Sequence, residues 1–441
     1  MSSNDVNRIW IKGGHLIDPA TKTDGPRDLL IENGRIAAVD TKLNANPGDV
    51  QVIDATGLVV TPGLVDIHVH LREPGQSYKE TIASGTAAAA AGGFTSVAAM
   101  PNTIPVNDSA EITRWMQAPE RDARARVYPI GAATVGSMGA TLTNYEALRD
   151  SGAVAVSDDG KPILGDETMR AVLSAAAAAG LPVIQHAEDT RLTGGCSMNA
   201  GPLAFRLGLR GMPVEAEAGI VARDIALLRE LDDDRAHLHV AHLSTKKALD
   251  HVRAARHSGL HVTCEVTPHH FVLTEEAVDE YDAHAKMNPP LRTVEDRDAM
   301  IEGLLDGTID CIATDHAPHA AHEKEQEFER APNGITGLET SLGLSLAVLH
   351  RRHGMSLLQI LALLSARPAA LLGLAAGTLA VGATADVVLL APETEWAFRA
   401  SESRSRSRNT PFDGWSLPGK VRLTMREARI VHREDPSIRQ P

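Results

Sequence analysis

The sequence predicts an α/β fold: a (β/α)8 TIM barrel with a small β-sandwich domain that both ends of the chain form together. Through the middle of the chain, apolar strand-like runs alternate with helical patterns, and this alternation is typical of a parallel sheet covered by helices. The apolar runs number eight, which is the count that closes a barrel. They span residues 59–70, 94–100, 127–133, 153–158, 182–186, 238–242, 262–266 and 309–314.

Helical patterns separate these runs, and each pattern ends near a Gly or Asp that leads into the next strand. The clearest helical patterns cover residues 214–231, 245–257 and 294–305. Two alanine runs, 87–91 and 175–179, lie within helical patterns that end at Gly. Because alanine side chains are small, we interpret these runs as helices packed closely against the barrel.

The two ends of the chain follow a different pattern, in which short apolar runs alternate with turn residues and no helix is apparent. The pair Asn33-Gly34 between apolar runs is a strong signal for a β-hairpin. The last part of the chain returns to this pattern after a glycine-rich stretch. We therefore expect residues 1–60 and 375–441 to form one small β domain, and residues 61–374 to form the barrel.

Composition limits the class of protein. The chain has 441 residues and a formal net charge of −14, which argues against nucleic-acid or anionic-membrane binding, because both attract positive charge. Three widely spaced cysteines without a CxxC pair fit a reducing compartment. No leader-like segment or membrane-spanning apolar run is apparent, so we expect a cytoplasmic protein. The Ser-Arg alternation over 401–408 is interpreted as a solvated loop, not as a nucleic-acid-binding arm.

Metal-binding residue types follow the predicted strands, at the ends where a barrel carries its active site. His68-Val69-His70 comes first, and because residues two apart on a strand share a face, both imidazoles point the same way. Imidazole suits zinc. Further donors end four later strands, at Asp159, His186, His242 and Asp315. Six donors exceed the tetrahedral shell of one zinc, so either two metals share a bridging carboxylate or one aspartate transfers protons.

Single residues of this set also have structural interpretations. A lone histidine at a strand end is usually a core or surface residue, Asp158-Asp159 could belong to an Asp-Gly turn, and Asp189 is a candidate helix N-cap. The common position of all the donors at strand ends favours a metal site over these interpretations.

The motifs at these positions resemble the amidohydrolase superfamily and, more closely, the dihydroorotases of the bacterial class I type. The resemblance extends over nearly the whole chain. Its most specific segments are HVHLREPG at 68–75, MPNT at 100–103, SDDG at 157–160, HLSTK at 242–246, VTPHH at 266–270, KMNPPLR at 286–292, ATDHAPH at 313–319 and NTPFDG at 409–414.

The resemblance implies a binuclear zinc centre. His68 and His70 would bind the more buried zinc. His186 and His242 would bind the second zinc, and Asp159 would bridge the two. Related ring-opening enzymes use a carboxylated lysine as the bridge, whereas the corresponding strand of this chain ends in Asp-Asp-Gly.

The resemblance also implies catalytic and substrate-binding residues. Asp315 would be both a ligand of the buried zinc and the general acid and base. The Arg72 guanidinium suits a substrate carboxylate through two parallel hydrogen bonds. Lys161 is expected at the surface. The set implied to hold substrate is His70, Arg72, Asn102, Asn288, His319, Asn333 and Gly334.

Enzymes of this family interconvert N-carbamoyl-L-aspartate and L-dihydroorotate with loss or gain of water, the ring-closing step of pyrimidine biosynthesis. The resemblance implies two zinc ions per subunit, a small-molecule substrate, and a zinc-activated water that attacks the ring amide. A homodimer is expected because dimers are the commonest assembly. Aspartate carbamoyltransferase is a candidate partner because some relatives work bound to it.

Two alternatives stay open. A hydantoinase or allantoinase shares the barrel and a related metal centre, but no lysine replaces Asp159 here, and Arg72 and Asn102 provide for a carboxylated substrate. A non-catalytic scaffold would lose metal ligands, and this chain keeps the full set.

Two local features are left undecided by the sequence. Residues 319–330 are rich in Glu and Lys, and they fit either a moving lid or a solvated loop. His269 and His270 follow the seventh predicted strand, where they are either structural or catalytic.

Overall fold

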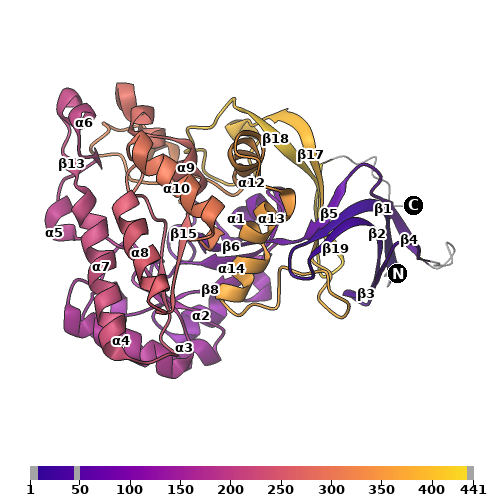
Figure 1. The fold of residues 1–441 in the computed structure, drawn as a ribbon, viewed down its shortest axis with the longest axis horizontal. Helices are drawn as coiled ribbons and strands as arrows, with labels where there is room; N and C mark the ends of the chain where they lie inside the picture. The colour runs from indigo at the N-terminus through magenta and orange to yellow at the C-terminus, as the bar shows by residue number, and fades with distance from the viewer. Residues whose placement is uncertain (1–7, 44–49, 435–441) are drawn as a thin grey trace.

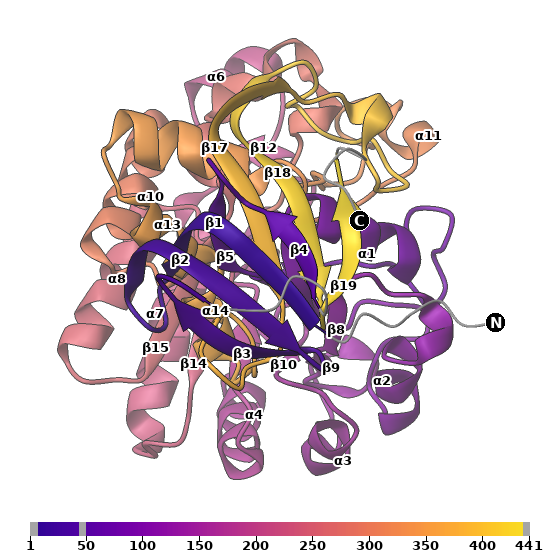
Figure 2. The same cartoon turned by 90° about the vertical axis from the view of Figure 1, so that its right-hand side faces the viewer.

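A computed structural model describes residues 8–43 and 50–434 of the chain. Both ends of this described part join one sheet, which stands beside a larger region of parallel strands and helices (Figures 1 and 2). The strand order of the sheet is β19-β18-β17-β5-β1-β2-β3, and β4 also pairs with β1. The strands are β1 (Arg8–Asp18), β2 (Thr23–Glu32), β3 (Arg35–Asp40), β4 (Gln51–Asp54), β5 (Val59–Pro62), β17 (Val387–Ala397), β18 (Ser416–Arg426) and β19 (Arg429–Arg433).

The predicted hairpin at Asn33-Gly34 is confirmed. It joins β2 to β3, with Glu32 paired opposite Arg35. Asn33 has φ 52° and Gly34 has φ 76°, and this pair of positive φ angles is typical of the type I′ turn that matches the twist of a hairpin.

The predicted small β domain is one connected sheet in its described residues, with a core cluster of its own that includes Ile11, Leu29 and Val387. The pairing of β1 with β2 shifts register between Ile11 and Gly14, and a bulge of this kind bends the strand. The sheet packs against three helices of the larger region, α1 (Ile82–Ala91), α12 (Ser341–Ser345) and α13 (Leu357–Leu364).

The apolar run 59–70 forms two strands that belong to different sheets. Its first part is β5, which pairs with β17 in the terminal sheet, and its second part is β6 (Leu64–Val69), which pairs with β7. Gly63 lies between them, and a Cβ on Gly63 would sit 2.0 Å from the Thr95 hydroxyl oxygen. Because both parts are buried throughout, periodicity alone does not reveal where the chain changes sheets.

Each of the predicted central runs contains a parallel strand, and neighbours in sequence order are paired in space. The third run is interrupted at Ile130. An isolated parallel bridge between Val69 and His316 links the segment after the last strand to the first strand. The strands are β6, β7 (Phe94–Ala99), β8 (Arg126–Pro129), β9 (Gly131–Ala132), β10 (Val156–Ser157), β11 (Val183–Gln185), β14 (Leu238–Val240), β15 (Val262–Val266) and β16 (Cys311–Ile312). The short strands β12 (Met198–Asn199) and β13 (Gly211–Met212) pair with each other.

Side chains of the parallel strands divide between two cores. On β6, Val65 and Ile67 join one cluster, whereas Leu64 and Val69 join the cluster that also contains the helices. Successive strand residues point to opposite faces, so strands of this kind need an apolar partner on both sides. This explains the near-continuous apolar runs in the sequence.

The helices that separate the strands follow the predicted patterns, and the alanine runs lie in α1 and α4. Thr245, the first residue of one predicted pattern, is the N-cap of α8. The helices are α1 (Ile82–Ala91), α2 (Ala110–Met116), α3 (Tyr145–Asp150), α4 (Asp166–Ala179), α5 (Thr190–Thr193), α6 (Pro202–Leu207), α7 (Val214–Leu231), α8 (Lys246–His257), α9 (Pro268–Val272), α10 (Val294–Asp306), α11 (Ala321–Lys324), α12 (Ser341–Ser345), α13 (Leu357–Leu364) and α14 (Ala366–Leu371).

The segment 401–408 is not the fully solvated loop that its composition predicts. Its serines alternate with arginines so that Ser405 and Ser407 are buried. The Ser405 hydroxyl donates to the Glu80 carboxylate, and the Ser407 hydroxyl donates to the Lys79 carbonyl oxygen at 2.7 Å. The arginines that alternate with these serines have exposed side chains: Arg404, Arg406 and Arg408.

Among the residues that the structure describes, none of the helices combines the length and the apolar character needed to cross a bilayer. All three cysteines are free, with Cys264 and Cys311 buried and Cys196 partly exposed.

Gly92, at the C-terminus of α1, offers a test of how tightly the helices are fitted. A Cβ at this position would lie 2.1 Å from the Leu338 carbonyl oxygen. Because main chain would have to move, we expect Gly92→Ala to lower the free energy of unfolding by about 1–3 kcal/mol in urea titrations. Gly219, exposed within α7 and free of neighbours within 4 Å, is the control: Gly219→Ala should stabilise by about 0.5–1 kcal/mol. Equal stability of the two variants would contradict this packing.

Candidate metal centre and substrate cavity

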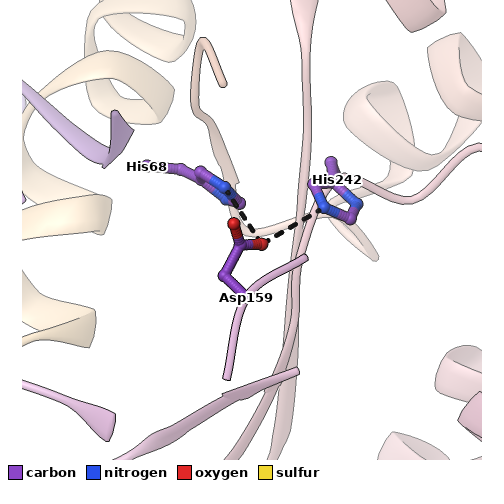
Figure 3. Close-up of side chains that lie close together, drawn as sticks. All are labelled: His68, Asp159 and His242. Carbon is purple, nitrogen blue, oxygen red and sulfur yellow. Dashed lines mark ion pairs between the residues drawn. The ribbon is translucent and has the colours of Figure 1, made fainter. Parts of the chain in front are cut away.

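The six predicted metal ligands converge although they come from five separate segments of the chain. Each lies in or directly after a parallel strand, and all are buried, with exposed fractions of 6% or less. Figure 3 shows His68 and His242 pointing from two sides toward the carboxylate of Asp159. The structure therefore brings together the set His68, His70, Asp159, His186, His242 and Asp315.

Asp159 lies at the centre of the cluster. Its Oδ1 atom is 3.6 Å from His68 Nε2, 3.6 Å from His186 Nδ1 and 3.9 Å from His242 Nε2. Its Oδ2 atom is 3.6 Å from His70 Nε2. A carboxylate that presents its two oxygens to different histidines has the arrangement expected of a bridging ligand.

Three groups of donors have all their ligand atoms within 4.8 Å of one another, and two of these groups consist of predicted metal ligands; the third is His239, Glu265 and Cys311. One group is His68, His70 and Asp315, which matches the set predicted for the more buried metal. The other is His68, Asp159 and His242. His186 lies beside the second group, because its Nδ1 atom is 2.9 Å from His242 Nε2.

The main chain adopts an unusual conformation at three of the predicted site residues. Arg72 has φ 61°, His242 has φ 30° and Asp315 has φ 46°. Residues other than glycine rarely occupy this left-handed region, and where they do, the surrounding structure has to stabilise them. The positive φ angles turn these side chains away from the direction that a regular strand would give them.

Buried carboxylates lie behind two of the histidines. Glu265 Oε1 is 2.6 Å from His68 Nδ1, and Glu188 Oε2 is 2.9 Å from His186 Nε2. These contacts leave His68 Nε2 and His186 Nδ1 directed at Asp159. Carboxylates that bind the second ring nitrogen are typical of metal-ligating histidines, because they fix the orientation of the ring.

The carboxylates of the cluster favour a positive charge among the ligands. Burial opposes protonation of His68, but the charges of Glu265 and Asp315 outweigh it and raise the pKa of His68 to about 10. Burial likewise opposes ionisation of Glu265, yet the neighbouring His68 charge brings the pKa of this carboxyl down to about 2. The His68 Nε2 atom is nevertheless buried without a hydrogen-bond partner. A metal cation would satisfy both the charge balance and this nitrogen.

An open cavity of about 420 Å³ lies over the cluster. Every residue predicted to hold substrate lines this cavity except Gly334, and every predicted metal ligand lines it except His68. Asn288 donates from Nδ2 to Glu188 Oε2 at 2.9 Å, while its Oδ1 atom is buried without a partner. That oxygen is free to accept a hydrogen bond from a bound molecule.

The other predicted substrate residues are held by one another and by main chain. Asn102 Oδ1 is 2.8 Å from His70 Nδ1, and Asn102 Nδ2 donates to Asp159 Oδ2 at 3.1 Å. The structure thus places Asn102 against two predicted ligands as well as at the cavity. Arg72 Nε donates to the Pro318 carbonyl oxygen at 3.1 Å, and one Arg72 terminal nitrogen is 3.4 Å from His319 Nε2.

His319 connects to the loop that carries Asn333 and Gly334. His319 Nε2 is 2.9 Å from the Asn333 carbonyl oxygen. Burial, reinforced by the positive charges of Arg72 and Lys79, lowers the pKa of His319 to about 2, so its imidazole is neutral. Gly334 has φ 150°, and a Cβ there would lie 2.6 Å from the Ala317 carbonyl oxygen, so the close approach of the two loops requires glycine.

The segment after His319 is anchored by buried lysines. Lys286 Nζ donates to the carbonyl oxygens of Phe328, Glu329 and Ala331 at 2.7–3.0 Å. Lys324 is only 3% exposed, and its Nζ donates to the Pro332 carbonyl oxygen at 2.8 Å. The segment is therefore anchored at these points, while most of residues 321–330 are exposed, so the contacts do not decide between a moving lid and a solvated loop.

Several undecided residues have structural contacts. His270 lies 2.7 Å from the Thr267 hydroxyl and 3.0 Å from the Pro289 carbonyl oxygen, which favours a structural role. The neighbouring His269 keeps a buried Nε2 atom without a partner. Asp189 is the N-cap of α5, as its structural interpretation predicts. Lys161 is exposed, as expected.

Sequence reasoning missed Glu265 and Glu188. A signal existed for each of them: Glu265 is a carboxylate within the apolar run of β15, and Glu188 follows His186 by two residues. A charged residue in an otherwise apolar, buried strand needs a partner of opposite charge or a metal site nearby.

The chain is similar to known proteins over nearly its whole length. A family model described as dihydro-orotase-like matches residues 57–248. A dihydroorotase from Syntrophus aciditrophicus is 47% identical over 430 residues, covering 97% of this chain and 100% of that protein. A dihydroorotase from Syntrophotalea carbinolica is 49% identical over 427 residues, covering 97% of this chain and 99% of that protein.

Solved structures of ring-opening enzymes share the fold. A dihydropyrimidinase from Brevibacillus agri superposes with a TM-score of 0.83 at 26% identity, covering 97% of this chain and 95% of that one. An L-hydantoinase from Arthrobacter aurescens gives a TM-score of 0.85 at 25% identity, with 96% of each chain covered. With sequence relatives near half identity over almost every residue, the chain belongs to the dihydroorotase family.

Proposed function

We propose that this chain is a dihydroorotase, which catalyses the reversible cyclisation of N-carbamoyl-L-aspartate to L-dihydroorotate and water in pyrimidine biosynthesis. The observation that carries the proposal is the buried cluster centred on Asp159, beneath a cavity lined by Arg72 and Asn288, in a chain whose relatives are dihydroorotases over their full length. An arginine at the cavity supplies a site for a substrate carboxylate, which an acidic chain otherwise lacks.

The cofactor that fits the cluster is zinc, with two ions per subunit. Four imidazoles and two carboxylates are donors that zinc prefers. The unpartnered His68 Nε2 atom and the central Asp159 carboxylate support metals on both sides of Asp159. His68, His70 and Asp315 would hold one ion, and His186 and His242 the other.

When bound, zinc lowers the pKa of a coordinated water to around 7 and polarises a carbonyl group. Asp315 lines the cavity with its Oδ1 atom 2.9 Å from His70 Nε2. From there its carboxylate takes the proton of the attacking water and passes it to the departing ring nitrogen. Arg72 binds the substrate carboxylate, and Asn288 Oδ1 accepts a hydrogen bond from the substrate.

The surrounding residues hold these groups in place. Glu265 and Glu188 fix the rings of His68 and His186. The neutral His319 and Asn333 line the substrate site, and Gly334 follows Asn333 outside the cavity lining. Fixed groups lower the entropic barrier because they need no rearrangement during the reaction.

The finer assignments of the chain are also proposals. We assign it to the class I type, with its parallel strands closed into a (β/α)8 barrel through the Val69–His316 bridge. We assign residues 1–60 and 375–441 to the small β-sandwich domain and residues 61–374 to the metal-dependent catalytic domain; residues 1–7, 44–49 and 435–441 lie outside the described part of the chain. Free cysteines support a cytoplasmic location. A homodimer and binding to aspartate carbamoyltransferase complete the proposal.

Hydantoin or allantoin ring opening is the second candidate, because the structural neighbours include hydantoinases. The bridging position argues against it. Asp159 occupies the centre of the cluster, and the nearby Lys161 is exposed, so no lysine reaches the place of a carboxylated bridge.

A ring-opening assay of purified zinc-loaded protein tests the proposal. We expect turnover of dihydroorotate and none of hydantoin or allantoin. Asp315→Asn should lower kcat by about 10²–10⁴-fold, because general acid-base catalysis contributes a factor of this size. Because Asp315 is also a proposed zinc ligand, we expect the variant to retain only part of its zinc, measured on the same sample. Asp386→Asn, which alters a buried aspartate at the junction of the two sheets, is the matched control with normal turnover. Opening of hydantoin alone would refute the proposed substrate, and a full-rate Asp315→Asn enzyme would refute the acid-base assignment.

Glu265 provides a test of the metal centre that does not depend on turnover. Because Glu265 orients His68, we expect Glu265→Gln to weaken zinc binding by about 10–100-fold in a chelator competition titration. Glu339→Gln is the control, since Glu339 accepts hydrogen bonds from Ser403 and from the main chain of Arg404, away from the histidines. Equal zinc affinities of the wild-type and Glu265→Gln proteins would show that Glu265 does not support a metal ligand.

A further inference from the structure

We propose that Asn409 is a positioning residue for the substrate site, acting from outside the cavity through the two loops that carry His319 and Gly334. Asn409 belongs to the segment between β17 and β18, which the terminal sheet sends across to the parallel-strand region. The inference rests on the proposed function only because that function assigns those two loops to the substrate-binding site.

The side-chain amide of Asn409 makes three hydrogen bonds to these loops. Its Oδ1 atom accepts from the His319 amide at 2.9 Å. Its Nδ2 atom donates to the carbonyl oxygens of Ala317 and Gly334, each at 2.9 Å. Asn409 is 2% exposed, so all three bonds are shielded from water.

These bonds begin where main-chain pairing between the loops ends. His316 and Ile335 form a parallel bridge, and the Ala317 amide donates to the Ile335 carbonyl oxygen at 2.9 Å. Beyond this point the Ala317 and Gly334 carbonyl oxygens and the His319 amide bond to the Asn409 side chain. Buried main-chain groups need partners, and one amide supplies all three.

The loop that Asn409 holds is linked, through the His319 side chain, to groups that face the cavity. His319 Nε2 is 2.9 Å from the Asn333 carbonyl oxygen and 3.4 Å from an Arg72 terminal nitrogen. A shift of the 317–319 loop relative to Gly334 would therefore move the imidazole away from both. Within the described part of the chain, the Asn409 side chain bonds to none of the predicted metal ligands, so we expect its loss to weaken substrate binding and not metal binding.

Neither aspartate nor alanine meets these requirements. Aspartate at 409 would keep the shape and the acceptor for the His319 amide, but it would set an ionised oxygen against two carbonyl oxygens. Alanine would leave all three main-chain groups without partners. The two substitutions therefore weaken the same contact by different means.

Asn409→Asp and Asn409→Ala, compared with the wild-type protein, test the proposal. We expect KM for dihydroorotate to rise by at least about tenfold, the size expected when a buried hydrogen bond is lost, with a smaller change in kcat. Zinc content should stay unchanged. Hydrogen–deuterium exchange should increase in peptides that cover 317–319 and 334–336. If the alanine variant does not fold, the shape-preserving aspartate variant and its exchange pattern decide the outcome.

Thr424→Val is the matched control. The Thr424 hydroxyl donates to the Ala90 carbonyl oxygen at 2.7 Å and is fully buried, so the substitution removes one bond of the same kind between the terminal sheet and α1, far from the cavity. We expect normal KM and exchange in this variant.

Three results would overturn the proposal: an unchanged KM in folded Asn409 variants, an equal rise of KM in Thr424→Val, or loss of zinc in the Asn409 variants. If the wild-type protein does not turn over dihydroorotate, the proposed function fails, and the exchange at 317–319 and 334–336 still decides whether Asn409 fixes the loops. Unchanged exchange there would overturn its positioning role independently of the substrate.

Discussion

The burial of one carboxylate among four imidazoles is the constraint on which the rest of the structure depends. Asp159 lies within 3.6–3.9 Å of four ring nitrogens, in a cluster that is almost inaccessible to water. Charged groups at such a place need compensation. Without a metal the cluster retains protons, as the pKa of about 10 for His68 and for His186 shows. A pair of dications would take over this role, and proton release would accompany their binding.

The apolar packing of the parallel-strand region stabilises the fold enough for it to hold this concentration of buried polar groups. The six donors lie in or after five different strands, and the strands themselves are packed on both faces by apolar side chains. Glu265 and Glu188 extend the polar cluster by one layer and hold two of its rings. The left-handed main chain at His242 and Asp315 is stabilised in turn by this packing. The site is therefore rigid because the surrounding core is dense.

Local patterns predict much of this arrangement, and long-range contacts account for the remainder. The hairpin at Asn33-Gly34 follows from two residues that favour positive φ, and the donors after each strand follow from the rule that strand ends meet at one rim. The change of sheet at Gly63 and the inward turn of Ser405 and Ser407 are set by contacts with residues far away in sequence. The role of Asn409 is likewise set by long-range contacts, because its side-chain amide forms hydrogen bonds with loops about 75 and 90 residues away in sequence.

Anomalous diffraction at the zinc edge, from crystals of the zinc-loaded protein, tests the proposal that Asp159 bridges two metal ions. We expect two anomalous peaks, one on each side of the Asp159 carboxylate, with His68 and His70 at one peak and His186 and His242 at the other. A zinc-loaded crystal with no peak at this cluster, or with a single peak that Asp159 does not contact, would contradict it.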